Sequence, residues 1–309
     1  MDAFYARYPG AVLSTSINKY MYISSHRFFF TGQVRVKYSE TETVNHIDEL
    51  KHPLLRETMR KTGVTSGIEI SSIADIPSGT GMGSSSSFTV GLLHCLYAVK
   101  REFVSHDQLA REACEIEIDL LGEPIGKQDQ YAAAFGGLNH LIFRKSGRVE
   151  IDHLVLPDNL LDKVFENSLL IWTGIQRDAS DVLSKQNKNV QRQLGGYKSL
   201  ANDSRDCKEI FLHPPEYFLQ EFGKLLEKSW QTKKSLEESI SSTEIDEIHS
   251  QIKSLGGYGG KLSGAGGGGF FFEIVPQERH EAVLSLYGPS KVLSVAHEPL
   301  GSRLLSEIF

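Results

Sequence analysis

The sequence has few cysteines, no long apolar run and no cluster of basic residues. Cys95, Cys114 and Cys207 are far apart and form no CxxC pair, so we expect neither a disulfide framework nor a cysteine metal site. Every apolar run is far shorter than the roughly 20 residues that span a bilayer. The formal net charge is −6, and the lack of a long basic stretch argues against a nucleic-acid partner.

The first ten residues, MDAFYARYPG, also lack the apolar segment of a secretory signal. With 40% hydrophobic and 23% charged residues, the composition is typical of a soluble globular protein. We therefore expect a cytoplasmic protein with small-molecule partners and no membrane partner. The sequence gives no indication of its oligomeric state.

Patterns of apolar residues predict helices and strands in both halves of the chain, which indicates an α+β fold with two lobes. The predicted strands are 12–24, 34–38, 67–74, 138–143, 148–154, 168–173, 270–275 and 291–296. The predicted helices are 49–62, 84–100, 105–122, 124–135, a polar stretch from 178 to about 246 that is interrupted near 213–215, 244–255 and 277–286. The segment 157–160 predicts a boundary between domains 1–156 and 157–309.

A glycine- and serine-rich segment, residues 77–87, lies between a predicted strand and a predicted helix. Glycine lets the backbone approach a phosphate and adopt positive φ, and the helix N-terminus presents unpaired N–H groups with a partial positive charge. The alternative is a flexible turn with a serine N-cap, but such a turn needs neither three spaced glycines nor four serines. The residues predicted to bind the phosphates of ATP are Gly79, Thr80, Gly81, Met82, Gly83, Ser84, Ser85 and Ser86.

Other nucleotide-binding patterns do not fit. No Gly-Lys-Ser/Thr follows the first loop, so it is not a Walker A loop, and Mg²⁺ and the helix dipole must balance the phosphate charge. A second glycine run, 264–269, fits G-x-G-x-x-G, but a predicted strand follows it where a dinucleotide-binding motif needs a helix. No H-R-D or D-F-G occurs, which excludes a protein kinase. We expect the second run to form a tight turn packed against the first loop.

Phosphoryl transfer needs a metal ligand and a group that orients or deprotonates the acceptor hydroxyl. Glu117 lies beside the apolar stripe of its predicted helix, which places it near a buried edge, although a single helical glutamate is usually a surface charge. Asp129 stands in the segment G-K-Q-D-Q at 126–130, where it is either a helix-start charge or a catalytic carboxylate. Periodicity does not decide between these alternatives.

The two glycine motifs resemble those of the GHMP kinases, a family that includes galactokinase and homoserine, mevalonate and phosphomevalonate kinases. P-x-x-x-G-M-G-S-S-S at 77–86 resembles their central phosphate-binding motif, and K-L-S-G-A-G-G-G-G-F at 261–270 resembles their C-terminal motif. The order and separation of the motifs also agree, and the resemblance covers nearly the whole chain. It implies a two-lobed GHMP kinase fold, with a ribosomal-S5-like N-terminal lobe and a ferredoxin-like C-terminal lobe.

The resemblance also implies an ATP-dependent sugar kinase and gives roles to individual residues. Asp129 corresponds to the catalytic acid-base residue of the galactokinase-like segment. Glu117 corresponds to the Mg²⁺-binding glutamate of the family, and Ser85 to the loop serine that shares the metal.

Further segments resemble sugar kinases of the heptose 7-phosphate kinase type, namely 3–8, 17–20, 128–137 and 173–180. This branch implies transfer of the γ-phosphoryl group of ATP to the anomeric 1-hydroxyl of D-glycero-D-manno-heptose 7-phosphate, which gives the 1,7-bisphosphate for nucleotide-activated heptose synthesis. Lys19, Gly174 and Arg177 are the predicted substrate residues. Lys19 and Arg177 are cations suited to the phosphate of the acceptor, and both are equally compatible with ordinary surface charges.

The sequence departs from the family at its start. Family members begin with a strand and an Arg- and Gly-rich substrate motif, and Met1 stands where that motif ends, so we expect the first strand and its sugar contacts to be missing. Three alternatives stay open. One is another sugar 1-kinase, for fucose, galactose or a uronic acid. The second is a GHMP decarboxylase, against which the G-K-Q-D-Q segment argues, and the third is a non-catalytic nucleotide-binding protein or a truncated fragment.

Overall fold

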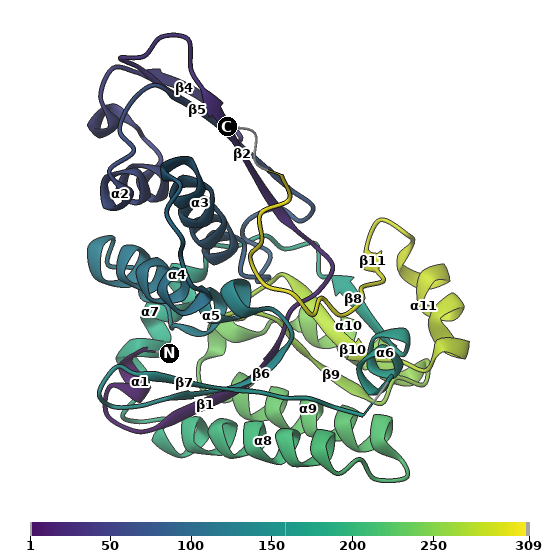
Figure 1. Cartoon of the computed structure of the whole chain (residues 1–309). Coiled ribbons are helices and arrows are strands. Elements are labelled where there is room, and N and C mark those ends of the chain that lie inside the picture. The colour runs from purple at the N-terminus through teal and green to yellow at the C-terminus, as the bar shows by residue number, and fades with distance from the viewer. Residues whose placement is uncertain (1, 158, 307–309) are drawn as a thin grey trace. The chain divides into compact units, whose positions relative to one another are not determined.

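The computed structural model describes residues 2–157 and 159–306, in which the chain forms two compact units. The first unit combines the residues up to 18 with 78–82 and 137–299, and the second combines 19–77, 83–136 and the residues from 300 onward. Figure 1 labels most of their helices and strands. Each unit mixes helices with strands, which confirms the predicted α+β class.

The second unit is built on a four-stranded sheet in the order β2-β5-β3-β4. β2 (Met21–Arg27) pairs antiparallel with β5 (Ile68–Ala74), β5 pairs parallel with β3 (Val34–Lys37), and β3 pairs antiparallel with β4 (Thr41–Val44). Because β5 leads directly into the glycine-rich segment 77–87, the sheet fixes the point at which that segment begins.

Helices complete the core of the second unit. α3 (Ser84–Lys100) packs against β2, and α2 (Pro53–Thr62) packs against α3. α4 (His106–Cys114) and α5 (Gln128–Phe135) pack against each other and against α3, and a 3₁₀ turn, η1 (Ile47–Glu49), precedes α2. The buried apolar core consists of Val34, Val36, Ile47, Leu50, Leu55, Met59, Ile68, Ile70, Phe88, Leu92 and Leu96.

The first unit contains two antiparallel sheets. One has the order β1-β6-β7, and the other has the order β11-β8-β10-β9. The strands of the first sheet are β1 (Gly10–Thr15), β6 (Leu138–Phe143) and β7 (Val149–His153). Those of the second are β11 (Val292–Leu293), β8 (Ser168–Trp172), β10 (Phe270–Ile274) and β9 (Gly259–Leu262).

Two long helices join these sheets into one core. α8 (Leu194–Leu212) packs on β1, and α9 (Phe218–Lys234) packs on α8 and on β9. Leu138, Phe211 and Ile274 meet in the shared apolar cluster. The remaining elements of this unit are α1 (Asp2–Tyr5), α6 (Leu160–Glu166), α7 (Ala179–Asn189), η3 (Glu238–Ile240), α10 (Thr243–Ser254), η4 (Gln277–Arg279) and α11 (His280–Tyr287).

Neither compact unit is one continuous part of the sequence. The boundary predicted between residues 156 and 157 lies inside the first unit, because β1 and α8 come from opposite sides of that position and pack against each other. Within the described ranges, none of the helices combines the length and the apolar character that crossing a bilayer requires.

The prediction of one strand over 12–24 is wrong. The chain leaves the first sheet after β1 and enters the second unit at β2. Between them, Ile17 forms a bridge with His297, and the Oδ1 atom of Asn18 accepts a hydrogen bond of 2.8 Å from the backbone N–H of Ala296. The alternating apolar residues on both sides of this crossing therefore belong to different sheets.

Strand β9 was not predicted, because it begins with two glycines. A Cβ atom on Gly259 would lie 2.5 Å from the carbonyl oxygen of Gly223 in α9, and one on Gly260 would lie 2.3 Å from the carbonyl oxygen of Phe272. Glycine here permits a close approach of helix and strand backbones. A pattern based on side-chain alternation does not detect such a strand.

The predicted helix 105–122 is confirmed as a continuous helical segment, but only its first half is α-helical. The Ser105 Oγ atom caps α4 by accepting a 3.2 Å hydrogen bond from the N–H of Gln108. After Cys114 the chain continues as a π-helix, η2 (Glu115–Leu120). Short π-helical turns are rare and occur frequently at functional sites.

Candidate active site

The glycine-rich segment 77–87 has the backbone conformation that its composition predicts. Gly79, Gly81 and Gly83 have φ values of 75°, 81° and 71°. This left-handed region strains any residue with a Cβ atom, so the three alternating positions require glycine. Residues 78–82 belong to the first unit, and the segment from Gly83 through Ser84, at the start of α3, belongs to the second.

The N-terminus of α3 has no side-chain cap. Gly83 is the N-cap residue and makes no side-chain cap hydrogen bond, while the Ser84 hydroxyl donates to the carbonyl oxygen of Pro77 over 3.4 Å. A serine N-cap, the alternative weighed from the sequence, is therefore not what the structure contains. The positive end of the dipole of this 17-residue helix and its first N–H groups are therefore suited to bind an anion.

The second glycine run packs against the first loop within the first unit, as predicted. A Cβ atom on Gly264 would lie 2.7 Å from the Cα atom of Gly81, and one on Gly81 would lie 2.9 Å from the carbonyl oxygen of Ser263. The N–H of Phe270 donates to the carbonyl oxygen of Thr80 over 3.3 Å. The two turns therefore restrain each other's backbone conformation.

We expect Gly269→Ala to destabilise the protein by at least about 2 kcal/mol, since backbone strain and a clash add. Gly269 has φ of 103°, and its Cβ atom would lie 2.2 Å from the carbonyl oxygen of Thr80. The midpoint of denaturant unfolding measures the effect. Gly195→Ala in α8 is the control, because nothing lies within 4 Å of that Cβ position; it should stabilise the helix by about 0.5–1 kcal/mol. Equal midpoints for the two variants would contradict the packing described.

Glu117 is buried and receives hydrogen bonds from two helices. Its exposed fraction is 1%, which excludes the alternative of a surface charge. The Ser86 hydroxyl in α3 donates to Oε2 over 3.3 Å, and the Gln130 Nε2 atom in α5 donates to Oε1 over 3.2 Å. The Ser85 side chain is a further hydrogen-bond partner. Burial, aided by the negative charge of Asp129, raises the pKa of Glu117 to about 7, although the hydrogen bonds to its carboxylate act in the opposite direction.

Asp129 lies near the start of α5, beside the end of the phosphate loop. A Cβ atom on Gly83 would lie 3.4 Å from its Cβ atom and 3.5 Å from its Cγ atom. The Gln128 Nε2 atom donates to Oδ1 of Asp129 over 3.1 Å. Asp129 is therefore positioned against the loop, although its place in the first turn of α5 also fits the interpretation as a helix-start charge.

The second unit thus brings together the predicted metal residues, Ser85 and Glu117, and the predicted catalytic residue, Asp129. Sequence reasoning missed Gln130, whose fully buried amide bonds to Glu117. The signal available was its position one residue after Asp129 in the G-K-Q-D-Q segment. An amide in the first turn of a helix is too common for that position alone to identify it.

Glu117 and the side chains around it are suited to bind a magnesium ion whose remaining ligands would be phosphate oxygens. In the described part of the chain, no three His, Cys, Asp or Glu side chains gather in a way that would hold a metal. Magnesium in nucleotide enzymes typically takes one or two carboxylates together with substrate phosphates. A buried carboxylate whose protein partners Ser86 and Gln130 are neutral calls for a cation once it is ionised.

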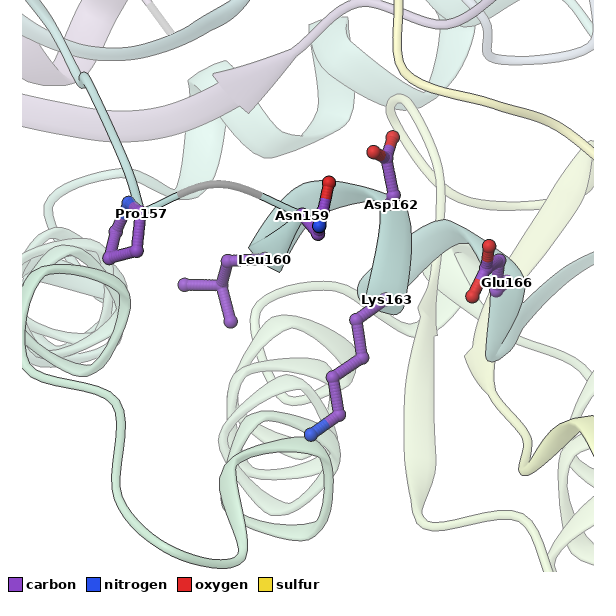
Figure 2. A pocket seen from close by; sticks show the side chains of 6 residues that line it. All are labelled: Pro157, Asn159, Leu160, Asp162, Lys163 and Glu166. Atoms are coloured by element: carbon purple, nitrogen blue, oxygen red, sulfur yellow. The ribbon is translucent and has the colours of Figure 1, made fainter.

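The predicted substrate residues lie in different units. Lys19 is half-buried at the start of the second unit, whereas Gly174 and Arg177 belong to the first. Gly174 is exposed and has φ of 83°. A pocket beside α6, drawn in Figure 2, contains none of the predicted site residues. It is lined by Pro157, Asn159, Leu160, Asp162, Lys163 and Glu166.

Sequence families and individual proteins resemble this chain over most of its length. The family described as GHMP kinases N terminal domain matches residues 49–137, and the one described as GHMP kinases C terminal matches residues 216–286. A D-glycero-alpha-D-manno-heptose 7-phosphate kinase from Campylobacter jejuni is 29% identical over 295 residues, which cover 91% of this chain and 86% of the relative. A galactokinase from Pyrococcus furiosus is 22% identical over 313 residues, with coverages of 89% and 85%.

Solved structures share the fold. A D-glycero-D-manno-heptose 1-phosphate kinase from Bacteroides thetaiotaomicron superposes with a TM-score of 0.77 at 22% identity, covering 96% of this chain and 90% of that one. A galactokinase from Lactococcus lactis in complex with galactose superposes with a TM-score of 0.76 at 17% identity, with coverages of 98% and 90%. At these identities the likeness establishes the architecture and leaves the substrate open.

Proposed function

The chain belongs to the GHMP kinase family and is an ATP-dependent sugar kinase, and on that premise we propose that it phosphorylates the anomeric 1-hydroxyl of D-glycero-D-manno-heptose 7-phosphate. The observation that supports this substrate is the 29% identity to a heptose 7-phosphate kinase across 91% of the chain. The product would be the heptose 1,7-bisphosphate.

In the proposed reaction the 1-hydroxyl oxygen of the sugar attacks the γ-phosphorus of ATP. The bond between that phosphorus and the β–γ bridging oxygen breaks, and its electron pair leaves with ADP. The proton of the hydroxyl passes to the carboxylate of Asp129, which acts as a general base or orients the hydroxyl. The position of Asp129 against Gly83, at the end of the phosphate loop, supports this role.

The loop residues from Gly79 to Ser86 are proposed to hold the phosphates of ATP. Three positive-φ glycines and an uncapped helix N-terminus supply backbone N–H donors that cost no reorganisation when the anion arrives. Since no lysine stands in the loop, the donors are mainly backbone groups. Lys19 and Gly174 are proposed for the acceptor, with the amine of Lys19 as a partner for its 7-phosphate.

Glu117, Ser85 and Ser86 are the residues proposed to hold Mg²⁺. When bound, the ion would neutralise charge on the phosphoryl oxygens. The protein contributes a buried carboxylate that donors on α3 and α5 hold in one orientation, in which it would bind the ion.

A panel of acceptors tests the substrate. ADP formation would be measured with heptose 7-phosphate, the free heptose, fucose, galactose and a uronic acid, and ³¹P NMR would locate the new phosphate. We expect kcat/KM for heptose 7-phosphate to exceed that of the others by about 10²-fold or more, because a site built for a phosphate loses a charge-assisted contact without it. A higher value for galactose or fucose would establish a different sugar 1-kinase and overturn the proposed substrate.

A further inference from the structure

Arg177 lies in the segment between β8 and α7, and this segment is tied to the first glycine loop. The N–H of Arg177 donates to the carbonyl oxygen of Gly79 over 3.2 Å, and the Gln176 Nε2 atom donates to the carbonyl oxygen of Ser78 over 2.6 Å. All of these residues belong to the first unit. The backbone of Arg177 is therefore held beside the phosphate loop.

The side chain of Arg177 runs along the second glycine turn. A Cβ atom on Gly264 would lie 3.1 Å from its Nη2 atom, and one on Gly267 would lie 3.8 Å from its Cδ atom. Gly264 is also the residue that meets Gly81 of the first loop. The guanidinium group thus lies beside the contact between the two glycine turns. A side chain at position 264 would crowd it.

The guanidinium group has no protein partner among the described residues. Its Nε, Nη1 and Nη2 atoms are all buried and have no hydrogen-bond partner in the part of the chain that the structure describes. Burial lowers the pKa of Arg177, and the charge of Asp178 opposes this effect only in part. An unpaired buried charge is costly, so the arrangement calls for an anion that arrives with a ligand.

A second cation reaches the same turn. The Lys233 Nζ atom donates to the carbonyl oxygens of Leu262 and Gly264. The guanidinium of Arg177 offers five N–H donors in a planar fork, which suits the oxygens of a phosphate. Two positive side chains at one glycine turn favour a ligand that carries more than one negative charge.

We propose that Arg177 binds a phosphate group of the nucleotide where the two glycine turns meet. The proposal rests on the ATP dependence of the enzyme and is independent of which sugar it accepts. It competes with the sequence-based expectation that Arg177 binds the phosphate of the acceptor. The nucleotide is favoured because the backbone of Arg177 bonds to Gly79 of the phosphate loop, while its side chain lies against Gly264, the residue that packs on Gly81 of the same loop.

The test uses Arg177→Met, which keeps the length of the side chain and removes its charge, and Arg177→Lys, which keeps the charge and removes the fork. Calorimetric titration with ATP and with ADP measures the nucleotide, and steady-state kinetics give KM for the sugar phosphate. We expect at least a tenfold loss of ATP affinity in Arg177→Met, a smaller loss in Arg177→Lys, and an unchanged KM for the acceptor. The exposed Arg192, changed to Gln, is the matched control and should behave as wild type.

The stability of the unliganded protein separates binding from packing. Because Arg177→Met removes an unpaired buried charge, its thermal midpoint without nucleotide should equal or exceed that of wild type, while the upward shift caused by ATP should shrink. Unchanged ATP affinity with a raised KM for the sugar phosphate would assign Arg177 to the acceptor and overturn the proposal. Lower stability with unchanged nucleotide affinity would make it a packing residue. A wild-type protein that binds no ATP would instead overturn the kinase assignment.

Discussion

Replacing Asp129 by Asn is expected to lower kcat by about 10²-fold or more and to leave ATP affinity unchanged, which is the usual size of the loss when a general base is removed. Asparagine keeps the shape of the side chain and its contact with Gly83 but takes up no proton. Single-turnover phosphoryl transfer at saturating ATP and sugar measures the chemical step directly. Nucleotide titration of the same variant checks that the phosphate loop is intact.

The control for this experiment is Asp119→Asn. Asp119 lies in η2, close in sequence to Glu117, and is exposed, so its charge can be removed without touching the site. Its kcat should equal that of wild type. An Asp129→Asn enzyme with wild-type kcat would remove Asp129 from the mechanism and leave it as a helix-start charge.

Glu117→Gln is expected to raise the Mg²⁺ concentration required for half-maximal rate by at least about tenfold, because a neutral amide replaces the one carboxylate proposed for the ion. The bonds from Ser86 and Gln130 restrict the variant to small rearrangements. Magnesium titrations at saturating ATP and sugar provide the measurement. Glu115→Gln serves as the control, because it removes only the ion pair of Glu115 with Lys61 of α2. Superimposable magnesium curves for Glu117→Gln and wild type would refute the metal assignment.

The same substitution makes the stability of the metal-free protein depend less on pH. Burial raises the pKa of Glu117 from 4.5 to about 7, so between these values the folded state binds a proton that the unfolded state has lost. The contribution of Glu117 is therefore fully present below pH 4.5 and is lost as the pH rises through 7. At pH 8 without Mg²⁺, the Gln variant should be more stable than wild type by on the order of 1–3 kcal/mol.

Denaturant unfolding at pH 8 and near pH 4.5 checks this expectation, since the advantage of the variant should fade toward the lower pH. Addition of Mg²⁺ and ATP at pH 8 should favour wild type instead, because only the carboxylate gains from the cation. A stability difference that is the same at both pH values would mean that Glu117 does not titrate in this range.

The phosphate loop and the helix after it could be predicted from the sequence because both depend on local chemistry. Three alternating glycines specify positive φ without reference to the rest of the chain, and the apolar repeat of α3 extends from Ser84 to Lys100, the bounds that the structure has. The packing of the second glycine run on the first was predictable for a related reason. Many glycines directly before a strand indicate that another part of the backbone packs closely against them.

The environment of Glu117 could not be predicted, because it depends on contacts distant in sequence. Periodicity placed Glu117 beside a buried edge but not between Ser86 and Gln130, which are 31 and 13 residues away. The two compact units could not be predicted either, since each consists of segments that alternate along the chain with segments of the other. The sequence identified Arg177 only as a cation near a substrate motif. Its burial against Gly264 could be recognised only in the structure.

The π-helix η2 restricts how the length of this chain can change. With 3.6 residues per turn, removing one residue from an α-helix rotates everything beyond the cut by about 100° about its axis. A deletion between Cys114 and Glu117 would convert the wide turn into an ordinary one and turn the carboxylate away from Ser86 and Gln130. Insertions and deletions elsewhere in surface loops are tolerated far better. In alignments of active relatives, this short segment should therefore contain no gap, even where the surrounding loops differ in length.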